Sequence, residues 1–315
     1  MFKSFFLKKI GSLLAALGVF ETLDRVIVSQ SLLHARENRK KEKIHSLQEV
    51  EFRGYSQWGE DGILDWLVEK IPAIPETFVE FGVENYKQSN TRLLLWLRNW
   101  RGLVMDGSES HVKDIQKQDV SWRFSLTSKC AFIDRENINQ LLRDSGFVGE
   151  VGILSVDIDG NDYWVWEAIN EINPVIVVCE YNAVFGDVQS LTIPYDPTFY
   201  ISKGHYSNLY YGASIQALIG LAAKKGYSFV GTGSNACNAF FVRNDQAQGV
   251  LSRIGTVSIS CSHFRTSRNE FGALTFVDGM QRIGVIKHLP VYNVKTNKVL
   301  SISECGQLYS EGWGE

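Results

Sequence analysis

From residue 55 onward, short apolar runs alternate along the chain with amphipathic segments. Runs bounded by glycine, asparagine and aspartate predict strands, and segments with apolar residues three or four positions apart predict helices. Alternation of the two is typical of βα units and a parallel sheet. We therefore predict a doubly wound α/β fold. The expected strands are 77–82, 102–106, 151–156, 174–179, 227–231 and 238–243, with one more at 122–126 or 130–133, and the expected helices are 90–99, 163–169 and 214–225.

The first 20 residues place most of their apolar side chains near one helical face, with Lys3 and Lys8 outside it. The uncharged stretch at 10–20 is shorter than the roughly 20 residues that span a bilayer. We expect an amphipathic helix that makes peripheral contact with anionic lipid through residues 1–20. A helix packed on the body or on another subunit, and a secretory signal, are the alternatives. Supporting basic residues follow: Arg36, Arg39, Lys40, Lys41 and Lys43.

These patterns divide the chain into three parts. Residues 1–45 form a basic, amphipathic helical extension, 46–245 form the catalytic domain, and 246–315 form a β-rich extension packed on it. The last part has apolar runs at 257–260, 273–277 and 291–301, which predict strands. It is placed to cap a pocket or to make a contact within a homo-oligomer.

Composition narrows the class of protein. Hydrophobic residues make up 44% and charged residues 21%, as in an ordinary globular chain. The five cysteines are odd in number and lack C-x-x-C spacing, which argues against a disulfide framework and indicates a reducing, cytoplasmic setting. Residues 1–45 carry nine Lys and Arg against four Asp and Glu, so the remainder is more acidic than the net charge of −3. An acidic body argues against a nucleic-acid partner.

Four predicted strands end in an acidic residue: Glu80, Asp106, Asp157 and Glu180. In a parallel sheet these ends converge on one crevice, where ligands bind. Gly82 allows close backbone approach in the first turn, and a carboxylate at Asp106 is suited to accept hydrogen bonds from ribose hydroxyls. The first turn lacks the later glycines of G-x-G-x-x-G, which disfavours NAD or FAD.

Four segments together carry a resemblance to a known family. They are YSQWGEDG (55–62), FVEFG (78–82), WRGLVMD (100–106) and LSVDIDGND (154–162). Over about residues 50–245 the chain resembles the FkbM-type methyltransferases that use S-adenosylmethionine (SAM). The resemblance implies a class I, Rossmann-like fold with a mostly parallel seven-stranded sheet. It also implies methyl transfer from SAM to a hydroxyl of a polar acceptor, such as a sugar of a polysaccharide or glycolipid, or a natural product.

The resemblance assigns residues to the SAM site. Glu80 and Gly82 match the first SAM motif, Asp106 matches the ribose-binding acid, and Asp157 matches the acid that closes the fourth strand. We also expect Gln57, Glu60 and Ser108 to bind the cofactor. The sequence departs from the family at Glu84, where a small residue is usual, so a scaffold protein without cofactor affinity is an alternative.

An acidic cluster follows the fourth and fifth strands. Oxygen ligands there suit Mg²⁺ or another hard divalent cation, as in the catechol-type and macrocin-type methyltransferases that the cluster resembles. We expect Asp157, Glu180 and Asn182 to be metal ligands, and Asp157, Asp159 and His205 to be catalytic. The alternatives are a metal-free polar site, a turn whose carboxylates cap the next helix, and another type of metal-dependent enzyme.

Overall fold

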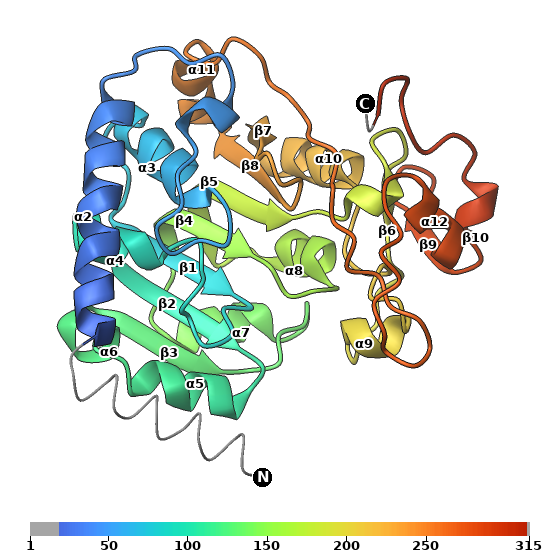
Figure 1. The fold of residues 1–315 in the computed structure, drawn as a ribbon, viewed down its shortest axis with the longest axis horizontal. Helices are drawn as coiled ribbons and strands as arrows, with labels where there is room; N and C mark the ends of the chain where they lie inside the picture. The colour runs from blue at the N-terminus through green and yellow to red at the C-terminus, as the bar shows by residue number, and fades with distance from the viewer. Residues whose placement is uncertain (1–18, 314–315) are drawn as a thin grey trace.

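The computed structural model describes residues 19–313, and within them a seven-stranded sheet forms the centre of the molecule (Figure 1). The strand order is β3-β2-β1-β4-β5-β8-β7. β1 to β5 run parallel, and β8 is antiparallel to both of its neighbours. The sheet is thus Rossmann-like, and the strand order reverses between β1 and β4. The strands are β1 Thr77–Phe81, β2 Arg101–Asp106, β3 Leu126–Cys130, β4 Gly149–Val156, β5 Ile172–Glu180, β7 Tyr227–Thr232 and β8 Asn238–Arg243.

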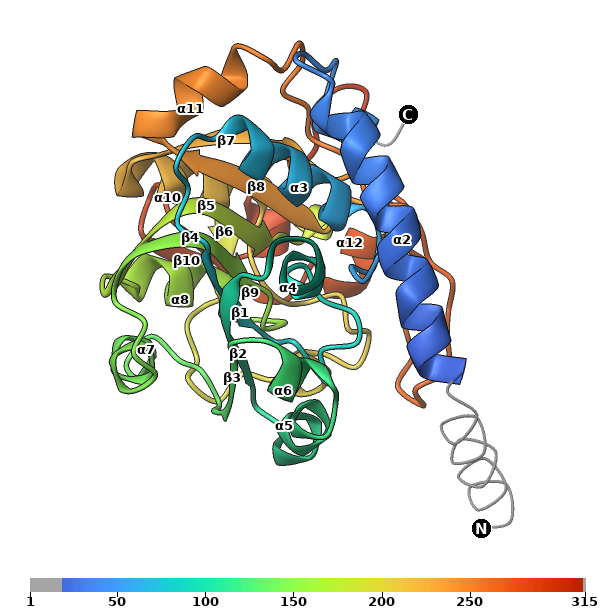
Figure 2. The same ribbon diagram turned by 90° about the vertical axis from the view of Figure 1, so that its left-hand side faces the viewer.

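Helices cover both faces of the sheet (Figure 2). α7, α8 and α10 pack on one face, whose core contains Phe81 and Leu154, and α3 to α6 with α11 pack on the other, whose core contains Phe78 and Ile153. Alternate residues of each strand therefore supply the two cores. The helices are α3 Glu60–Lys70, α4 Arg92–Arg98, α5 Glu109–Gln116, α6 Val120–Arg123, α7 Ile138–Asp144, α8 Asp162–Ala168, α10 Ile215–Lys225 and α11 Asn244–Leu251, with the 3₁₀ helix η1 Leu47–Val50.

The predicted strands and helices of the domain are confirmed to within a few residues, except near the third strand. β3 lies at Leu126–Cys130, between the two expected positions, and residues 120–123 form helix α6. The register explains this, because Gly102 pairs with Leu126 and Asp106 with Cys130. Pairing with β2 therefore selects the polar segment 126–130, and the apolar Trp122 is left on a surface helix with 73% of its area exposed.

A second lobe lies beyond the carboxyl edge of the main sheet (Figure 1). It combines an insertion after β5 with the end of the chain, and its core includes Phe185, Leu191 and Val291. Only the hairpin at 291–301 is confirmed among the strands predicted after residue 245. Its elements are η2 Ala183–Phe185, β6 Leu191–Thr192, α9 Ile201–Gly204, α12 Gln281–Ile286, β9 Pro290–Asn293, β10 Lys298–Ser301 and η3 Ile302–Glu304, with β10-β9-β6 forming one sheet.

The other two predicted strands of this region are wrong for a common reason. The segment 257–260 is fixed by side chains, since the Ser260 N–H donates to the Thr232 hydroxyl and the Gln48 amide donates to Ser258. The segment 273–277 closes a small turn, in which the Thr275 N–H donates to the Ser267 carbonyl. Each run makes only isolated backbone contacts, Ser258 with Thr232 of β7 and Leu274 with Arg268, so no strand forms and periodicity alone misleads.

The N-terminal helix α2, Val19–Arg39, packs against α3 and α4. Arg39 is ion-paired with the buried Asp65 at 2.6 Å, and Lys41 is paired with Glu49. The segment 1–45 is therefore partly built into the body, and part of its basic cluster is neutralised. Nearly all of the amphipathic helix expected at 1–20 lies outside the described residues, so lipid contact stays a prediction. No helix in 19–313 is both long enough and apolar enough to cross a membrane.

Candidate functional site

Two adjoining cavities open at the carboxyl edge of the sheet, where the strand order reverses. The large cavity holds about 380 Å³ and the small cavity about 140 Å³. Both are lined by Gly82, Glu84, Asp157 and Asp159, which follow β1 and β4. The acidic strand ends thus converge as the sequence predicts, because parallel neighbours end at one edge.

Backbone contact explains the glycine in the first turn. Gly82 has φ of 70°, and a Cβ there would lie 1.5 Å from the carbonyl oxygen of Asp157. The residue therefore lets the ends of β1 and β4 touch. Glu84 and Asp159 also have positive φ, 47° and 54°. A glycine at position 84 would take this left-handed conformation without strain, whereas Glu84 takes it at a cost of about 1–2 kcal/mol.

Asp106 holds the turns on both sides of it. Its Oδ2 accepts the Glu84 N–H at 2.8 Å, and its Oδ1 accepts the Ser108 N–H at 2.8 Å and lies 3.0 Å from Nδ1 of His111. Ser108 caps α5, and all three residues line the large cavity with Asp106. Each carboxylate oxygen has two lone pairs, so Oδ2 keeps one for a ligand. His111 was not predicted, and its position one helical turn after Ser108 is the signal that was missed.

Glu80 stabilises the backbone beside the site. Its carboxylate accepts the N–H groups of Asn90 and Thr91 and the Thr91 hydroxyl, so it anchors the chain that enters α4. Burial raises the pKa of Glu80 to about 7, and the hydrogen bonds from Thr91 oppose the rise. Glu80 also lines the small cavity. Its Oε2 accepts two hydrogen bonds and its Oε1 accepts one, so the carboxylate mainly fixes the backbone around the cavity.

The acidic cluster contains three carboxyl groups with oxygens within 4.8 Å of one another: Asp157, Asp162 and Glu180. Burial raises the pKa values of Asp157 and Glu180 well above their usual range, their neighbours' charges add to the rise, and the two groups hydrogen-bond each other. Repulsion between two carboxylates this close favours protonation of one of them. Asp159 lines both cavities, and its pKa is raised by loss of hydration there and by repulsion from Glu84.

Asp162 does not cap the next helix, as one alternative for this turn expected, but closes the loop that precedes that helix; the N-cap residue of α8, Asn161, makes no side-chain capping hydrogen bond. The Asp162 carboxylate accepts the N–H groups of Ile158 at 2.7 Å and Gly160 at 2.9 Å, which holds the loop in shape. Burial raises its pKa to about 6, and those hydrogen bonds limit the rise. Each of its oxygens therefore already has a partner, so Asp157 and Glu180 are the freer oxygen donors.

Two predicted site residues are placed elsewhere. The Asn182 amide donates to the carbonyls of Leu209 and Tyr211, and its oxygen accepts the Val184 N–H. The Asn182 side chain is fully buried, and these hydrogen bonds hold the loop after β5. The acidic cluster contains Asp162 in place of Asn182.

His205 follows α9 and lines neither cavity. Its Nδ1 lies 2.7 Å from the Ser207 hydroxyl, and its ring lies against Tyr206 and near His288. Partial burial, with His288 nearby, lowers its pKa. His205 is thus part of the second lobe and is not positioned as a general base.

The predicted residues before β1 divide into two roles. Gln57 is exposed and lines the small cavity. Glu60 is buried, and its Oε1 accepts a hydrogen bond from the Asn238 amide at 3.0 Å. Asn238 was missed by the sequence reasoning, and it lines the small cavity from the first position of β8.

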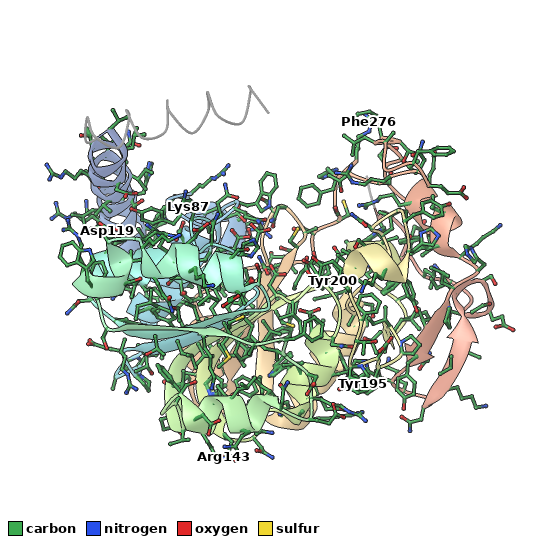
Figure 3. All side chains as sticks on the ribbon, turned by 90° about the horizontal axis from the view of Figure 1, so that it is seen from below. Lys87, Asp119, Arg143, Tyr195, Tyr200 and Phe276 are labelled. Atoms are coloured by element: carbon green, nitrogen blue, oxygen red, sulfur yellow. The ribbon has the colours of Figure 1, made fainter. Side chains whose placement is uncertain are left out.

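The second lobe closes one side of the large cavity. Phe199, Tyr200 and Ile201 line it from this lobe, opposite Ala131 to Ile133 after β3. Tyr200 lies between the main sheet and the second lobe (Figure 3). The insertion after β5 therefore contributes residues to the site, and the end of the chain packs on this insertion.

No family model and no curated protein sequence matches the chain. Among solved structures, a SAM-dependent methyltransferase from Clostridium acetobutylicum is 10% identical over 58% of this chain and 90% of that one, with a TM-score of 0.37. An O-methyltransferase from Bacillus cereus, in complex with S-adenosylhomocysteine (SAH), is 12% identical over 69% and 89%, with a TM-score of 0.36. The pyocyanin biosynthetic protein PhzM is 11% identical over 55% of this chain, which spans about half (52%) of its length, with a TM-score of 0.35. Similarities this weak do not show an activity, so the activity has to be argued from the site itself.

Proposed function

We propose that the protein is a SAM-dependent O-methyltransferase of the FkbM type, acting on a hydroxyl of a polar acceptor such as a glycan. The observation that carries the proposal is the large cavity at the point where the strand order reverses. There the glycine turn after β1 meets a carboxylate at the end of β2 and an acid at the end of β4. The sequence resemblance assigns the same three positions, Gly82, Asp106 and Asp157, to SAM.

The donor set fits this cofactor. A volume of about 380 Å³ lies in the range of small-molecule sites. Asp106 offers a lone pair to a ribose hydroxyl, and the Asn161 oxygen is buried without a partner at the same cavity. Within residues 19–313, no Lys or Arg lines either cavity. SAM carries a sulfonium and an ammonium against one carboxylate, so its net charge is positive and an acidic site favours it electrostatically.

Bound SAM supplies an electrophilic methyl group, and the protein has to orient the acceptor and receive its proton. Asp157 and Glu180 are suited to the second task because their raised pKa values make their ionised forms stronger bases than ordinary carboxylates. The Phe199 to Ile201 segment covers the large cavity and reduces access of water.

A site that also holds a divalent ion is the second case to test, because the oxygens of Asp157, Asp162 and Glu180 lie within 4.8 Å of one another. Calorimetry with SAM and with SAH, each with and without Mg²⁺, separates the cases. The proposal expects micromolar binding of both nucleosides without metal. Binding of Mg²⁺ alone would favour another metal-dependent enzyme, and no binding of SAM would favour a scaffold protein.

A further inference from the structure

A loop before α12 exposes several large apolar side chains. We call residues 265–280 the apolar loop. Phe271 in it is 92% exposed, and Leu274, Phe276 and Met280 are each about half exposed. Single apolar residues are common on protein surfaces, but a group of them in one exposed loop is typical of a surface that contacts another molecule.

The backbone of the apolar loop is held in shape by its own hydrogen bonds. The Thr275 N–H donates to the Ser267 carbonyl at 2.8 Å, and the hydroxyls of these two residues lie 2.6 Å apart. At the tip, Oδ1 of Asn269 accepts the N–H groups of Phe271 and Ala273, both at 3.0 Å. The apolar side chains are therefore presented by a backbone that is already ordered, which lowers the entropy cost of binding through them.

The apolar loop lies on the same face of the molecule as α2. In Figure 2, α2 and the orange chain that leads to α12 both lie at the right-hand side. In Figure 3, α2 and Phe276 both lie at the upper edge. α2 also has exposed apolar side chains: Leu23, Val26 and Leu33. Two segments that are far apart in the sequence thus bring apolar surface to one face.

The chain that leads into α2 indicates the chemistry of the partner. Residues 1–18 lie outside the described residues, and their sequence contains Lys3, Lys8 and Lys9 but no Asp or Glu. They join the described chain at Val19, the first residue of α2. Apolar side chains interspersed with basic residues suit a lipid surface with anionic headgroups.

The apolar loop itself is neutral. Arg265 is ion-paired with Asp278 at 3.3 Å, and the loop has one further charge of each sign, on Arg268 and Glu270. Its contact with lipid would therefore be apolar, whereas the chain before α2 would supply the preference for anionic headgroups. Two contacts on one rigid body bind more tightly than either does alone.

We propose that this face attaches to an anionic lipid surface, with Phe271 and Phe276 of the apolar loop inserted among the lipids. Such a surface can deform around an exposed loop, whereas a second copy of the chain would need a matching groove. The site lies next to this attachment, because the Phe264 ring is 5.2 Å from the Trp58 ring and the neighbouring Gln57 lines the small cavity. Attachment itself does not depend on the proposed function.

The test is sedimentation of the full chain with vesicles of phosphatidylcholine and phosphatidylglycerol, without SAM. The variant, called the loop variant, combines Phe271→Ser with Phe276→Ser. The matched control is Trp122→Ser, because Trp122 is also an exposed aromatic residue but belongs to α6, which lies away from the α2 side in Figure 2. Circular dichroism checks that the variants fold.

The wild-type chain should bind these vesicles, and the loop variant should bind about tenfold or more weakly, as expected when two phenylalanine side chains no longer leave water. Trp122→Ser should bind like the wild type. The ratio between wild type and loop variant should be the same at low and high salt, because salt screens charges and not apolar contacts. In addition, Phe271→Trp should show more fluorescence quenching by lipids brominated in their acyl chains than the wild type does.

The proposal is overturned if the wild-type chain does not bind the vesicles, or if the loop variant binds them as tightly as the wild type. It is also overturned if, in the absence of lipid, sedimentation velocity shows a wild-type dimer that the loop variant converts to a monomer, because the apolar loop would then be a contact between copies. Should the loop variant fail to fold, equal quenching of Phe271→Trp and the wild type refutes insertion.

Discussion

Replacing Gly82 with alanine tests whether contact between the ends of β1 and β4 shapes the site. The added Cβ would lie 1.5 Å from the Asp157 carbonyl oxygen, far inside the 3.0 Å below which real Cβ contacts are essentially absent. The neighbour is backbone, so no rotamer change relieves the clash. The N–H of Gly82 also donates to the Met105 carbonyl at 2.9 Å, which ties the turn to β2.

The expected cost has two parts. A residue with a Cβ at φ of 70° costs about 1–2 kcal/mol, and forced overpacking costs about 1–3 kcal/mol more. Gly82→Ala should therefore lower the free energy of unfolding by about 2–5 kcal/mol, measured by urea denaturation followed by circular dichroism. Gly107→Ala is the matched control at the same edge, because its Cβ would meet nothing closer than 3.5 Å. If Gly82→Ala lies within about 0.5 kcal/mol of the wild-type value, the reasoning about this turn is refuted.

Three further predictions concern the surroundings of the site. Glu84→Gly should raise the free energy of unfolding by about 0.5–1 kcal/mol, because φ of 47° suits glycine, and unchanged or lower stability in urea would contradict this. Glu80 has its pKa raised by burial to about 7, so the folded state holds the proton more tightly and stability falls as pH rises from about 4.5 to 7. Glu80→Gln should remove up to about 3 kcal/mol of that fall between pH 4.5 and 8, and an unchanged slope in urea titrations at several pH values counts against the assignment. Asp65→Ala leaves Arg39 and Arg98 with Glu69 as their remaining carboxylate partner and should cost about 1.5–3 kcal/mol, whereas an unchanged melting temperature would mean that α2 is not held by this ion pair.

The same ion pair revises an expectation about the N-terminal extension. The charge pattern predicts that residues 1–45 are an extension distinct from the catalytic domain. Arg39 contacts the buried Asp65, and Ile44 is buried beside Ile254, to which its backbone is bridged. These partners are far apart in sequence, so local periodicity contains no signal for them.

The strands and the convergence of the acidic ends were predictable because both follow from local patterns. Strand length and turn residues fix β1, β2, β4 and β5, and a parallel sheet brings Asp106, Asp157 and Glu180 to one edge. The role of each carboxylate at this edge of the sheet was not predictable in the same way. Whether a carboxylate faces a cavity or caps its own loop depends on the φ of the turn, and Asp159 with φ of 54° leads into the turn that Asp162 closes.

Residues from distant parts of the chain account for the remaining differences. Asn182 is taken up by carbonyls nearly 30 positions later, and Asn238 reaches the small cavity through antiparallel pairing with β5. His205 was predicted to be catalytic because of its residue type, but it belongs to the second lobe. This lobe forms only because the insertion after β5 packs against the end of the chain. Such tertiary pairings are absent from a single-sequence pattern.

Binding of SAM to Asp106→Ala, compared with His205→Ala, tests the central claim most directly. Asp106 lines the large cavity with a free lone pair, whereas His205 lies outside both cavities. Calorimetry should show micromolar SAM binding to the wild-type protein, a loss of about 1.5–3 kcal/mol in binding free energy for folded Asp106→Ala, and no change for His205→Ala. Equal affinity of SAM for the wild-type protein and folded Asp106→Ala, or no binding to the wild-type protein, would contradict the assignment of this cavity to the cofactor.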